Sequence, residues 1–568
     1  MKAIKRKWIA AALALACLAG CGGTAASVAS GDATVATTAT DETALPQALS
    51  VLTMQLGSDP ETLDPARSTT LDSANLLLTM FEPLMIETED GALTPGQAES
   101  CTVSEDGLTW TLTLRQGLKW SDGTALTAKD FEYSFKRLMD LASPRAAALL
   151  GMIDGYDAAA GYPDANGVPT GTPDPDALNV TAEGRTLTIV LAYPYENFAS
   201  VLASPVLSPV QQATAEENGT AWADAPETYI SNGPYCLQEW APGDHLLVAR
   251  NPYYSGGWDS ARIVTDQLYF LLTSDAAVAY TEYNSGDAQL VCSVPTSEIP
   301  SLTRSEEGGD FYLLPVTGTC WLTMDFMSDT LGDARVRQAL SLAIDRAALV
   351  DTVWQEIGTP AYALVGPGVT DADGTPFAAN ANGGEGYLSD DAQANLEKAK
   401  NLLAVAGYPE GVGLPALTCA AASTGYSPAV AEYVKGAFAA VGVTLNIKTV
   451  TPAELADGLT NHAFEMAVSG GVCGWDDPAC LLQNFAAGDG GNAGQIANGR
   501  FDAALQASCT GDAETRFAAL HRAEDIAMEN AFVIPLAYPQ GYWLQDPGLH
   551  GVWYSANGYW HLQYAALG

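Results

Sequence analysis

Alternating apolar and polar residues predict strands and helices in the first half of the chain. Residues 110–114 (Trp-Thr-Leu-Thr-Leu) follow a period of two, which predicts a half-buried strand. Thr127, with Asp130 three residues later, predicts the capped start of a helix. The turn at residues 242–244 joins two short apolar runs, the first of which opens at residues 232–235, and it predicts a hairpin.

The second half of the chain alternates helical and strand-like patterns. Apolar residues spaced three and four apart predict three helices, each with a start or stop signal. These are residues 333–347 capped by Asp333, residues 396–406 stopped by Gly407, and residues 427–441 started by Ser427 and stopped by Gly442. A strand is expected directly afterwards, at residues 443–447. Helices that alternate with strands in this way indicate an α/β fold.

The N-terminus has the pattern of a secretory signal. Basic residues within the first seven positions precede an apolar run over residues 8–19, which is too short for a permanent membrane-spanning helix. Small residues then stand directly before Cys21, and this arrangement resembles the bacterial lipobox. The resemblance implies that residues 1–20 are a lipoprotein signal peptide and that the Cys21 thiol is acylated.

Residues 21–48 consist mainly of Gly, Ala, Ser and Thr. Such a composition cannot bury enough apolar surface to fold, so the segment is expected to be a flexible tether that spans about 30 Å. No later stretch is apolar for long enough to cross a membrane, and a soluble body is therefore expected after the tether. With about 520 residues, this body is too large for one hydrophobic core and should contain two or more lobes.

The formal net charge of the 568 residues is −42 at pH 7. A chain with this large negative charge repels phosphate backbones and anionic lipids. Nucleic acid is therefore not an expected partner. Attachment to a membrane would depend on the N-terminal lipid rather than on a basic patch.

Eight cysteines lie beyond the signal and the anchor: Cys101, Cys236, Cys292, Cys320, Cys419, Cys473, Cys480 and Cys509. An even number outside the cytoplasm allows up to four disulfides, but the spacing does not choose the pairs. The chain has no Cys-x-x-Cys pair and its five histidines are scattered, which argues against a zinc site. No metal or other cofactor is expected.

Several motifs occur in a fixed order along the body. They are residues 59–65 (DPETLDP), 81–84 (FEPL), 114–123 (LRQGLKWSDG), 232–235 (NGPY) with Trp240 and 251–252 (NP), 333–340 (DARVRQAL) with 343–346 (AIDR), and 406–409 (AGYP). The ordered set resembles the peptide-binding class of ABC-transporter solute-binding lipoproteins. This class comprises the oligopeptide- and dipeptide-binding proteins of bacterial extracellular solute-binding protein family 5.

The resemblance implies a two-lobed α/β fold of the periplasmic-binding-protein type, in the type II class of large peptide binders, with an extra subdomain inserted in lobe I. The implied boundaries are 49–98, 205–316 and 531–568 for lobe I, 99–204 for the inserted subdomain, and 317–530 for lobe II.

The resemblance also implies a function. The protein would capture a peptide or another small solute in the cleft between the lobes, close by a hinge motion, and present it to ABC transporter permease subunits. A peptide is favoured because the family holds the ligand's main chain like an added strand. The protein would not be an enzyme. It would be a monomer, anchored by lipid to the cell membrane and facing the extracellular side or the periplasm.

Residues 472–480 (VCGWDDPAC) resemble the cleft loop of this family, in which an aspartate holds the α-ammonium group of the peptide. In this chain Gly474 occupies the position of that aspartate. Trp475 occupies the position of a tyrosine in the family motif, and Asp477 matches the acidic residue before the motif's proline. A buried ammonium group without a carboxylate partner is costly. Either Asp476 supplies the carboxylate, or the ligand has no α-ammonium group. We favour Asp476, and we expect Asp477 to hold the loop or to cap the following helix.

Other ligand-binding candidates come from two further segments. The complete predicted set is Asp476, Trp475, Gly474, Asp477, Asp325, Met324, Trp321, Glu82 and Phe81. Asp325 follows Met324 on a predicted cleft strand but could also be a solvated strand end. The pair Phe81 and Glu82 could instead be a packing motif of lobe I. Trp321, Trp475 and Tyr426 could line pockets or belong to the core.

Two other classes of function stay open at this point. The first keeps the fold but changes the cargo to a nickel chelate, haem, an opine or a saccharide. The second is a secreted hydrolase that uses a carboxylate pair. Asp476 and Asp477 would point to opposite faces of a strand, which is poor geometry for flanking one bond, and the chain has no G-x-S-x-G, H-E-x-x-H or phosphate-loop motif.

Overall fold

The computed structural model describes residues 49–143, 145–161, 171–195, 197–303, 309–355, 357–489, 491–509 and 512–568. The chain divides into two compact units, Met1–Ala48 and Leu49–Gly568, and every described residue belongs to the second. The predicted signal peptide, the tether and Cys21 lie outside the described residues. In the part that is described, no helix combines the length and the apolar character needed to cross a membrane.

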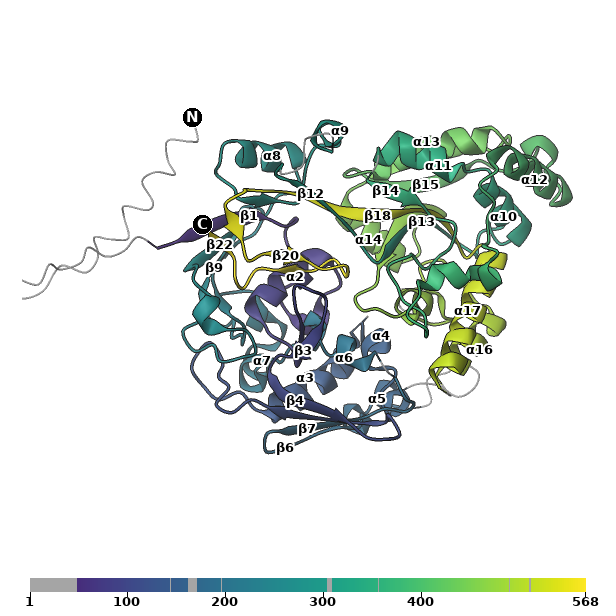
Figure 1. Ribbon diagram of the computed structural model, residues 1–568. Helices are drawn as coiled ribbons and strands as arrows, with labels where there is room; N and C mark the ends of the chain where they lie inside the picture. The colour runs from purple at the N-terminus through teal and green to yellow at the C-terminus, as the bar shows by residue number, and fades with distance from the viewer. Residues whose placement is uncertain are drawn as a thin grey trace, which may run out of the picture. The chain divides into compact units, whose positions relative to one another are not determined.

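One mixed sheet of twelve strands connects the two halves of this second unit (Figure 1). Its order is β16-β15-β17-β13-β18-β11-β1-β10-β9-β8, with β12 and β14 also paired to β18. We use the name lobe II for the elements from β13 to α17 and lobe I for the rest. Strand β18 (Val533–Gln545) is shared, since it pairs with β13 near its start and with β12 and β11 near its end.

Lobe I is built around three short parallel strands, in which β1 lies between β10 and β11 and pairs with both. Its elements are β1 (Val51–Gln55), α2 (Leu71–Met80), β2 (Met85–Glu87), β3 (Leu93–Pro95), α7 (Gln212–Asn218), β8 (Tyr235–Ala241), β9 (His245–Arg250), β10 (Gln267–Leu271), α8 (Ala276–Asn284), β11 (Leu290–Val291), α9 (Ile299–Leu302), β12 (Phe311–Pro315), β19 (Leu549–His550), β20 (Trp553–Tyr554), β21 (Trp560–His561) and β22 (Ala566–Leu567). The predicted hairpin is confirmed as the antiparallel pair β8 and β9.

A four-stranded antiparallel sheet, in the order β4-β5-β7-β6, forms a subdomain of lobe I. Its elements are β4 (Ala98–Val103), β5 (Thr109–Leu114), α3 (Ala128–Asp140), α4 (Ala146–Leu150), α5 (Tyr156–Ala160), β6 (Val180–Glu183), β7 (Thr186–Val190) and α6 (Phe198–Val201). The predicted strand is confirmed by β5, whose residues alternate between buried and half-buried. The predicted capping box is also confirmed, because Asp130 accepts a hydrogen bond from the Thr127 amide at 2.8 Å.

A buried ion pair fastens this subdomain to the rest of lobe I. Both Asp64 oxygens accept hydrogen bonds from the Arg137 guanidinium, at 2.7 and 2.6 Å, and the Trp222 indole donates to the same carboxylate at 3.2 Å. Burial alone would lower the pKa of Arg137, but the Asp64 carboxylate more than offsets it and the pKa is raised. The DPETLDP motif therefore has a structural task, which is to join the first lobe to helix α3.

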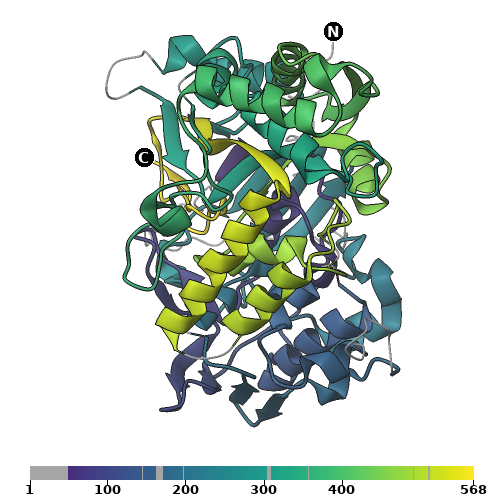
Figure 2. The same cartoon turned by 90° about the vertical axis from the view of Figure 1, so that its right-hand side faces the viewer.

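Lobe II packs helices on both sides of its part of the sheet. Its elements are β13 (Gly318–Met324), α10 (Ala334–Leu342), α11 (Arg346–Leu349), β14 (Gly358–Pro360), α12 (Ala392–Val405), β15 (Leu417–Ala422), α13 (Ser427–Ala439), β16 (Leu445–Val450), α14 (Pro452–Thr460), β17 (Met466–Val472), α15 (Ala479–Leu482), α16 (Gly499–Ser508) and α17 (Ala513–Glu529). Strand β15 pairs in parallel with both β16 and β17, which confirms the α/β fold class. Helices α16 and α17 lie next to each other in Figure 2.

The helix predicted over residues 333–347 is wrong in one respect. Asp333 caps α10 as expected, but α10 ends at Leu342, and a new helix, α11, begins at Arg346. The Asp345 carboxylate accepts from the Ala348 amide at 3.0 Å and starts this second helix. The predicted apolar stripe is buried as far as Ile344, whereas its last residue, Ala347, is exposed in α11.

The lobe boundaries expected from the sequence stay predictions. The first residues of β18 pair with β13 in lobe II, and the later ones pair with β12 in lobe I, so this strand belongs to both sets. All eight cysteines among the described residues are free thiols. Within the same residues, no three His, Cys, Asp or Glu side chains form a group that could hold a metal ion.

Candidate functional site

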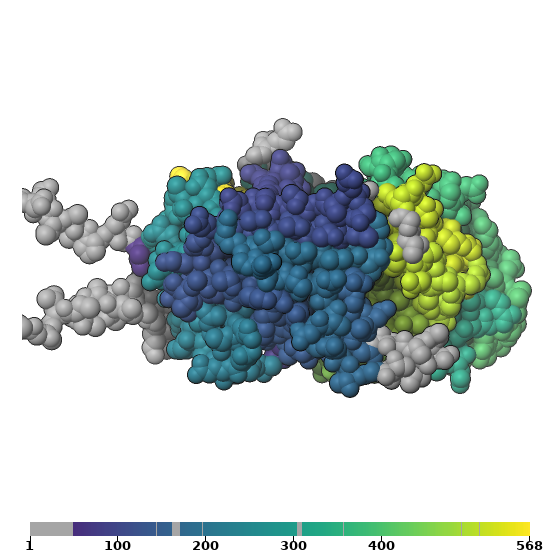
Figure 3. Space-filling view, turned by 90° about the horizontal axis from the view of Figure 1, so that it is seen from below, coloured from purple at the N-terminus to yellow at the C-terminus, as the bar shows by residue number. Residues whose placement is uncertain are grey.

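A cavity of about 710 Å³ lies where the two lobes face each other. Lobe I contributes residues 68–71 and Arg145, and lobe II contributes β13, β17 and the loop that follows β17. Asn557 and Tyr559, near the C-terminus, complete the wall. Figure 3 shows, from below, that the subdomain and helices α16 and α17 lie side by side. The volume is in the range that small-molecule sites commonly have.

The outer edge of strand β17 forms part of the cavity wall. Strand β13 pairs along the whole of β17, whereas β15 pairs with it at Met466 and Ala467. Among the described residues, no strand pairs with the other edge of residues 469–472, and all four of these residues line the cavity. On an antiparallel strand, alternate N–H and C=O groups point to the outer edge. The cavity therefore offers main-chain hydrogen-bonding groups to a ligand.

Aromatic side chains form part of the apolar wall of the cavity. Trp321 donates its indole N–H to the Thr323 hydroxyl at 3.2 Å and meets Phe485 edge to face, with ring centroids 5.7 Å apart. A Cβ atom at Gly471 would lie 2.7 Å from the Trp321 ring. Glycine at position 471 therefore allows the Trp321 indole to pack directly against strand β17.

The loop from Cys473 to Cys480 is anchored by a buried carboxylate. Asp477 is fully buried, and its Oδ1 accepts from the Ala479 amide at 2.8 Å and from Arg516 Nη2 at 2.9 Å. Arg516 Nη1 lies 2.8 Å from the other carboxylate oxygen. Burial alone would lower the pKa of Arg516, but the Asp477 carboxylate raises it overall. The Asp477 carboxylate therefore holds the loop and accepts from the first amide of α15, whose N-cap residue is Pro478. The ligand-binding role predicted for Asp477 stays a prediction.

Asp476 points away from the cavity. One carboxylate oxygen accepts from the Thr370 amide at 2.7 Å, and the other accepts from the Thr370 hydroxyl at 2.6 Å. The Asp476 carbonyl accepts from the Asn197 side-chain amide of lobe I at 2.6 Å. Asp476 is not among the residues that line the cavity. Its predicted role as an ammonium anchor stays a prediction.

Three of the predicted ligand-binding residues line the cavity: Gly474, Trp475 and Trp321. The others do not. Met324 is buried in the core of lobe II, and the Asp325 carboxylate accepts from the Met327 amide and the Gln495 side chain. The binding roles predicted for these two residues stay predictions.

Phe81 and Glu82 lie inside lobe I. The Glu82 carboxylate is fully buried and accepts from the Gln97 side chain at 3.0 Å, the Gly257 amide at 2.7 Å and the Tyr254 hydroxyl. Phe81 packs edge to face on Tyr229. These contacts are those of a packing motif, while the binding role predicted for this pair stays untested.

Sequence reasoning missed the charged groups of the cavity. Of the described residues that line it, Arg145 and Asp489 carry a formal charge. Burial raises the pKa of Asp489, and nearby Arg145 opposes part of that rise. Arg145 stands in a loop before α4 and Asp489 in a loop after α15, and neither has a flanking pattern that marks it as functional.

The arrangement described so far is an interlobe cavity with a free strand edge, aromatic walls and few charges. A sequence model of the family described as "Bacterial extracellular solute-binding proteins, family 5 Middle" matches residues 92–493. The chain belongs to family 5 of the bacterial extracellular solute-binding proteins. The family resemblance seen in the sequence is thereby confirmed, and the members of this family are binding proteins rather than enzymes.

Curated relatives cover most of the chain. The periplasmic murein peptide-binding protein MppA of Escherichia coli is 30% identical over 487 residues, which span 85% of this chain and 87% of that protein. The dipeptide-binding protein DppE of Bacillus subtilis is 27% identical over 522 residues, which span 91% of each.

A solved structure of the murein tripeptide-binding protein MppA of Escherichia coli matches with a TM-score of 0.80 and 28% identity, and covers 92% of this chain and 99% of that chain. The expected two-lobed fold of the periplasmic binding proteins is thereby confirmed. The unliganded open form of MppA covers 92% of this chain and 98% of its own but has a lower TM-score, 0.63.

Proposed function

We propose that this protein captures peptides in the interlobe cavity and delivers them to the permease of an ABC importer. The observation that carries the proposal is the unpaired edge of residues 469–472 in the cavity wall. A peptide laid along this edge would gain main-chain hydrogen bonds that do not depend on its sequence. The relatives DppE and MppA are named as dipeptide- and murein peptide-binding proteins, which supports a peptide cargo.

Closure of the lobes is the second part of the proposal. The hydrogen bonds that join the loop after β17 to lobe I include one from the Asn197 side chain to the Asp476 carbonyl and one from the Trp475 indole to the Tyr195 hydroxyl. These bonds require both lobes to be close together, so they favour the closed arrangement. A ligand that contacts both walls would shift the equilibrium in the same direction. The permease would then recognise the closed, loaded form.

Stoichiometric capture tests this function. The full chain, extracted with detergent, is mixed with a pool of random tri- to pentapeptides. Native mass spectrometry then measures the mass of the protein and of any peptide bound to it. We expect one peptide for each protein molecule and recovery of the peptides uncleaved, because binding needs no catalytic step. The proposal fails if no peptide is retained. Cleaved peptides would favour a hydrolase, and a co-purified organic molecule without amino acids would favour a non-peptide cargo.

Attachment to the membrane through Cys21 is proposed from the sequence pattern before it. The protein would act as a monomer on the extracellular or periplasmic side, held by its lipid. Cys21→Ser should move the protein from the membrane fraction to the soluble fraction. Cys17→Ser is the matched control, since this cysteine lies inside the apolar run, and it should leave the distribution unchanged. Equal membrane retention of both variants would contradict the anchor.

A further inference from the structure

Gly474 lies in the cavity wall beside two hydrogen-bond donors. A Cβ atom built on this glycine would lie 3.0 Å from the Tyr559 hydroxyl oxygen and 3.8 Å from Arg145 Nη2. All three residues line the cavity. Because position 474 has no side chain, none lies between the Gly474 main chain and these two donors, which line the cavity next to it.

Arg145 forms no ion pair with a described Asp or Glu residue, although its charge is close enough to Asp489 to oppose part of the rise in the pKa of that carboxyl. Within the described part of the chain, its buried Nε atom has no hydrogen-bond acceptor and its guanidinium forms no ion pair with an Asp or Glu residue. A buried donor without an acceptor costs free energy, which an incoming anion would recover.

Two described acids lie near Arg145 without forming an ion pair with it. The Asp489 carboxylate lines the same cavity, but its Oδ1 accepts from the Gly491 amide at 2.7 Å. Glu87 lies behind Tyr559, where the Asn557 side-chain amide donates to it at 3.5 Å. Burial raises the pKa of Glu87 to about 7, so a large part of it is uncharged near neutral pH.

We propose that the cavity binds its ligand through a carboxylate, which enters the space beside Gly474 and accepts hydrogen bonds from Arg145 and Tyr559. The proposal rests on the proposed function and names the chemistry of its cargo. Arginine binds carboxylates through two parallel hydrogen bonds, and this bidentate geometry fixes the orientation of the carboxylate. The carboxylate comes either from the C-terminus of a peptide or from an acidic side chain.

An ammonium group fits this place poorly. Arg145 would repel it, and Gly474 supplies no carboxylate. The acid two residues along, Asp476, has both of its oxygens hydrogen-bonded to Thr370. The local charge therefore favours an anionic ligand group, in contrast to the ammonium anchor that the sequence resemblance implies.

Three peptide pools test the proposal and distinguish the two sources of the carboxylate. The first pool holds random tri- to pentapeptides without Asp or Glu and with a free C-terminus. The second contains Asp and Glu but has amidated C-termini, and the third has amidated C-termini and no Asp or Glu. Capture by the full chain is measured by native mass spectrometry. We expect the first or the second pool to be captured and the third to bind roughly 30-fold more weakly or worse.

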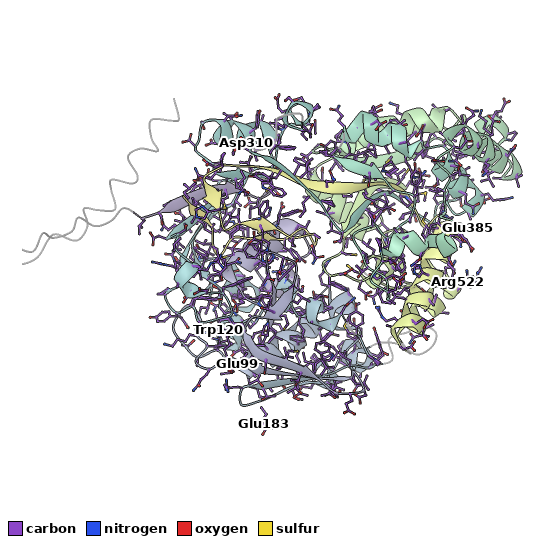
Figure 4. The ribbon with its side chains drawn as sticks, in the orientation of Figure 1. Glu99, Trp120, Glu183, Asp310, Glu385 and Arg522 are labelled. Atoms are coloured by element: carbon purple, nitrogen blue, oxygen red, sulfur yellow. The ribbon has the colours of Figure 1, made fainter. Side chains whose placement is uncertain are left out.

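Two variants connect this preference to the proposed residues. Arg145→Gln should weaken capture of the preferred pool roughly 30-fold or more and abolish the difference between the pools. Gly474→Asp would place a carboxylate next to Arg145 and should have the same effect while keeping the arginine. Arg522→Gln removes the same charge on the outer side of lobe II, as Figure 4 shows, and should change nothing. Thermal unfolding of each variant checks that it is folded.

The outcomes separate this proposal from the function on which it rests. If all three pools bind equally and Arg145→Gln binds as the unmodified chain does, the carboxylate site is refuted while peptide capture stands. If none of the pools binds to the unmodified chain, peptide capture itself is refuted, together with the site.

Discussion

The indole N–H of Trp475 donates a hydrogen bond to the hydroxyl of Tyr195 at 3.1 Å, although 280 residues separate them in the sequence. Trp475 belongs to the loop after β17 in lobe II, and Tyr195 belongs to the subdomain of lobe I. The Arg516 guanidinium, which holds the loop through Asp477, also lies over the Tyr195 ring at 4.6 Å. One tyrosine therefore contacts both the wall of the cavity and the ion pair that supports it.

The first prediction concerns this contact. Tyr195→Phe removes the acceptor and leaves the buried Trp475 N–H unpaired in the closed arrangement, at a cost of about 1–3 kcal/mol. Because the open arrangement exposes this N–H to water, the cost falls on closure, and peptide release should accelerate about 5-fold or more. Stopped-flow tryptophan fluorescence measures the release rate. Tyr253→Phe, on the exposed surface of lobe I, is the control, and equal rates for both variants would contradict the role of the contact.

The second prediction concerns the ion pair beneath the loop. Asp477→Asn removes the charge opposite a buried guanidinium, and breaking such a pair costs about 3–5 kcal/mol of unfolding free energy. Glu432→Gln breaks an exposed pair with Lys435 on α13 and should cost about 0.5 kcal/mol or less. Urea unfolding compares the two. Similar costs for both variants would show that the Asp477 pair does not hold the loop.

The third prediction concerns pH. Glu524 is buried on α17 and accepts from the Leu364 and Val365 amides, and burial raises its pKa to about 7 from 4.5. The folded state therefore binds the proton more tightly than the unfolded state, so this group's stabilising contribution is complete below pH 4.5 and is lost as pH rises to about 7.

Glu524→Gln cannot ionise, so its stability relative to the unmodified protein should increase by about 3 kcal/mol between pH 4.5 and pH 8. Urea unfolding at the two pH values measures the difference. Glu397→Gln, on the exposed face of α12, should show no such trend. A stability difference for Glu524→Gln that does not vary with pH would rule out the raised pKa.

The fourth prediction decides between the two anchors considered for position 474. If the ligand is held by its carboxylate at Arg145, N-acetylation of a captured peptide should change its dissociation constant by less than about threefold. If Asp476 holds an ammonium group, as the sequence suggests, acetylation should weaken binding roughly 30-fold, and Asp476→Asn should remove that penalty. Isothermal titration calorimetry with one captured peptide, in acetylated and free forms, measures both effects.

Local signals predicted much of the fold. The capping box of α3, the hairpin of β8 and β9 and the glycine stop of α12 each depend on residues close together in the sequence, and all are present. The break between α10 and α11 was missed because the apolar stripe continues through it. The cap at Asp345 was visible in the sequence, but periodicity outweighed it.

Cavity residues were predicted only in segments that match a motif of the family. Gly474, Trp475 and Trp321 line the cavity. Arg145 and Tyr559 were not predicted, because contacts between distant segments bring them to Gly474 and no short motif records such contacts. The direction of the Asp476 side chain was equally hidden, since it depends on Thr370, 106 residues away.

A crystal structure of the full chain with a captured peptide tests the central claim most directly. We predict that the peptide lies in the cavity, that its main chain pairs with the outer edge of residues 469–472, and that one of its carboxylates lies within hydrogen-bond distance of Arg145 and Tyr559. A peptide bound outside this cavity, or bound in it with Arg145 still unpaired, would contradict the claim.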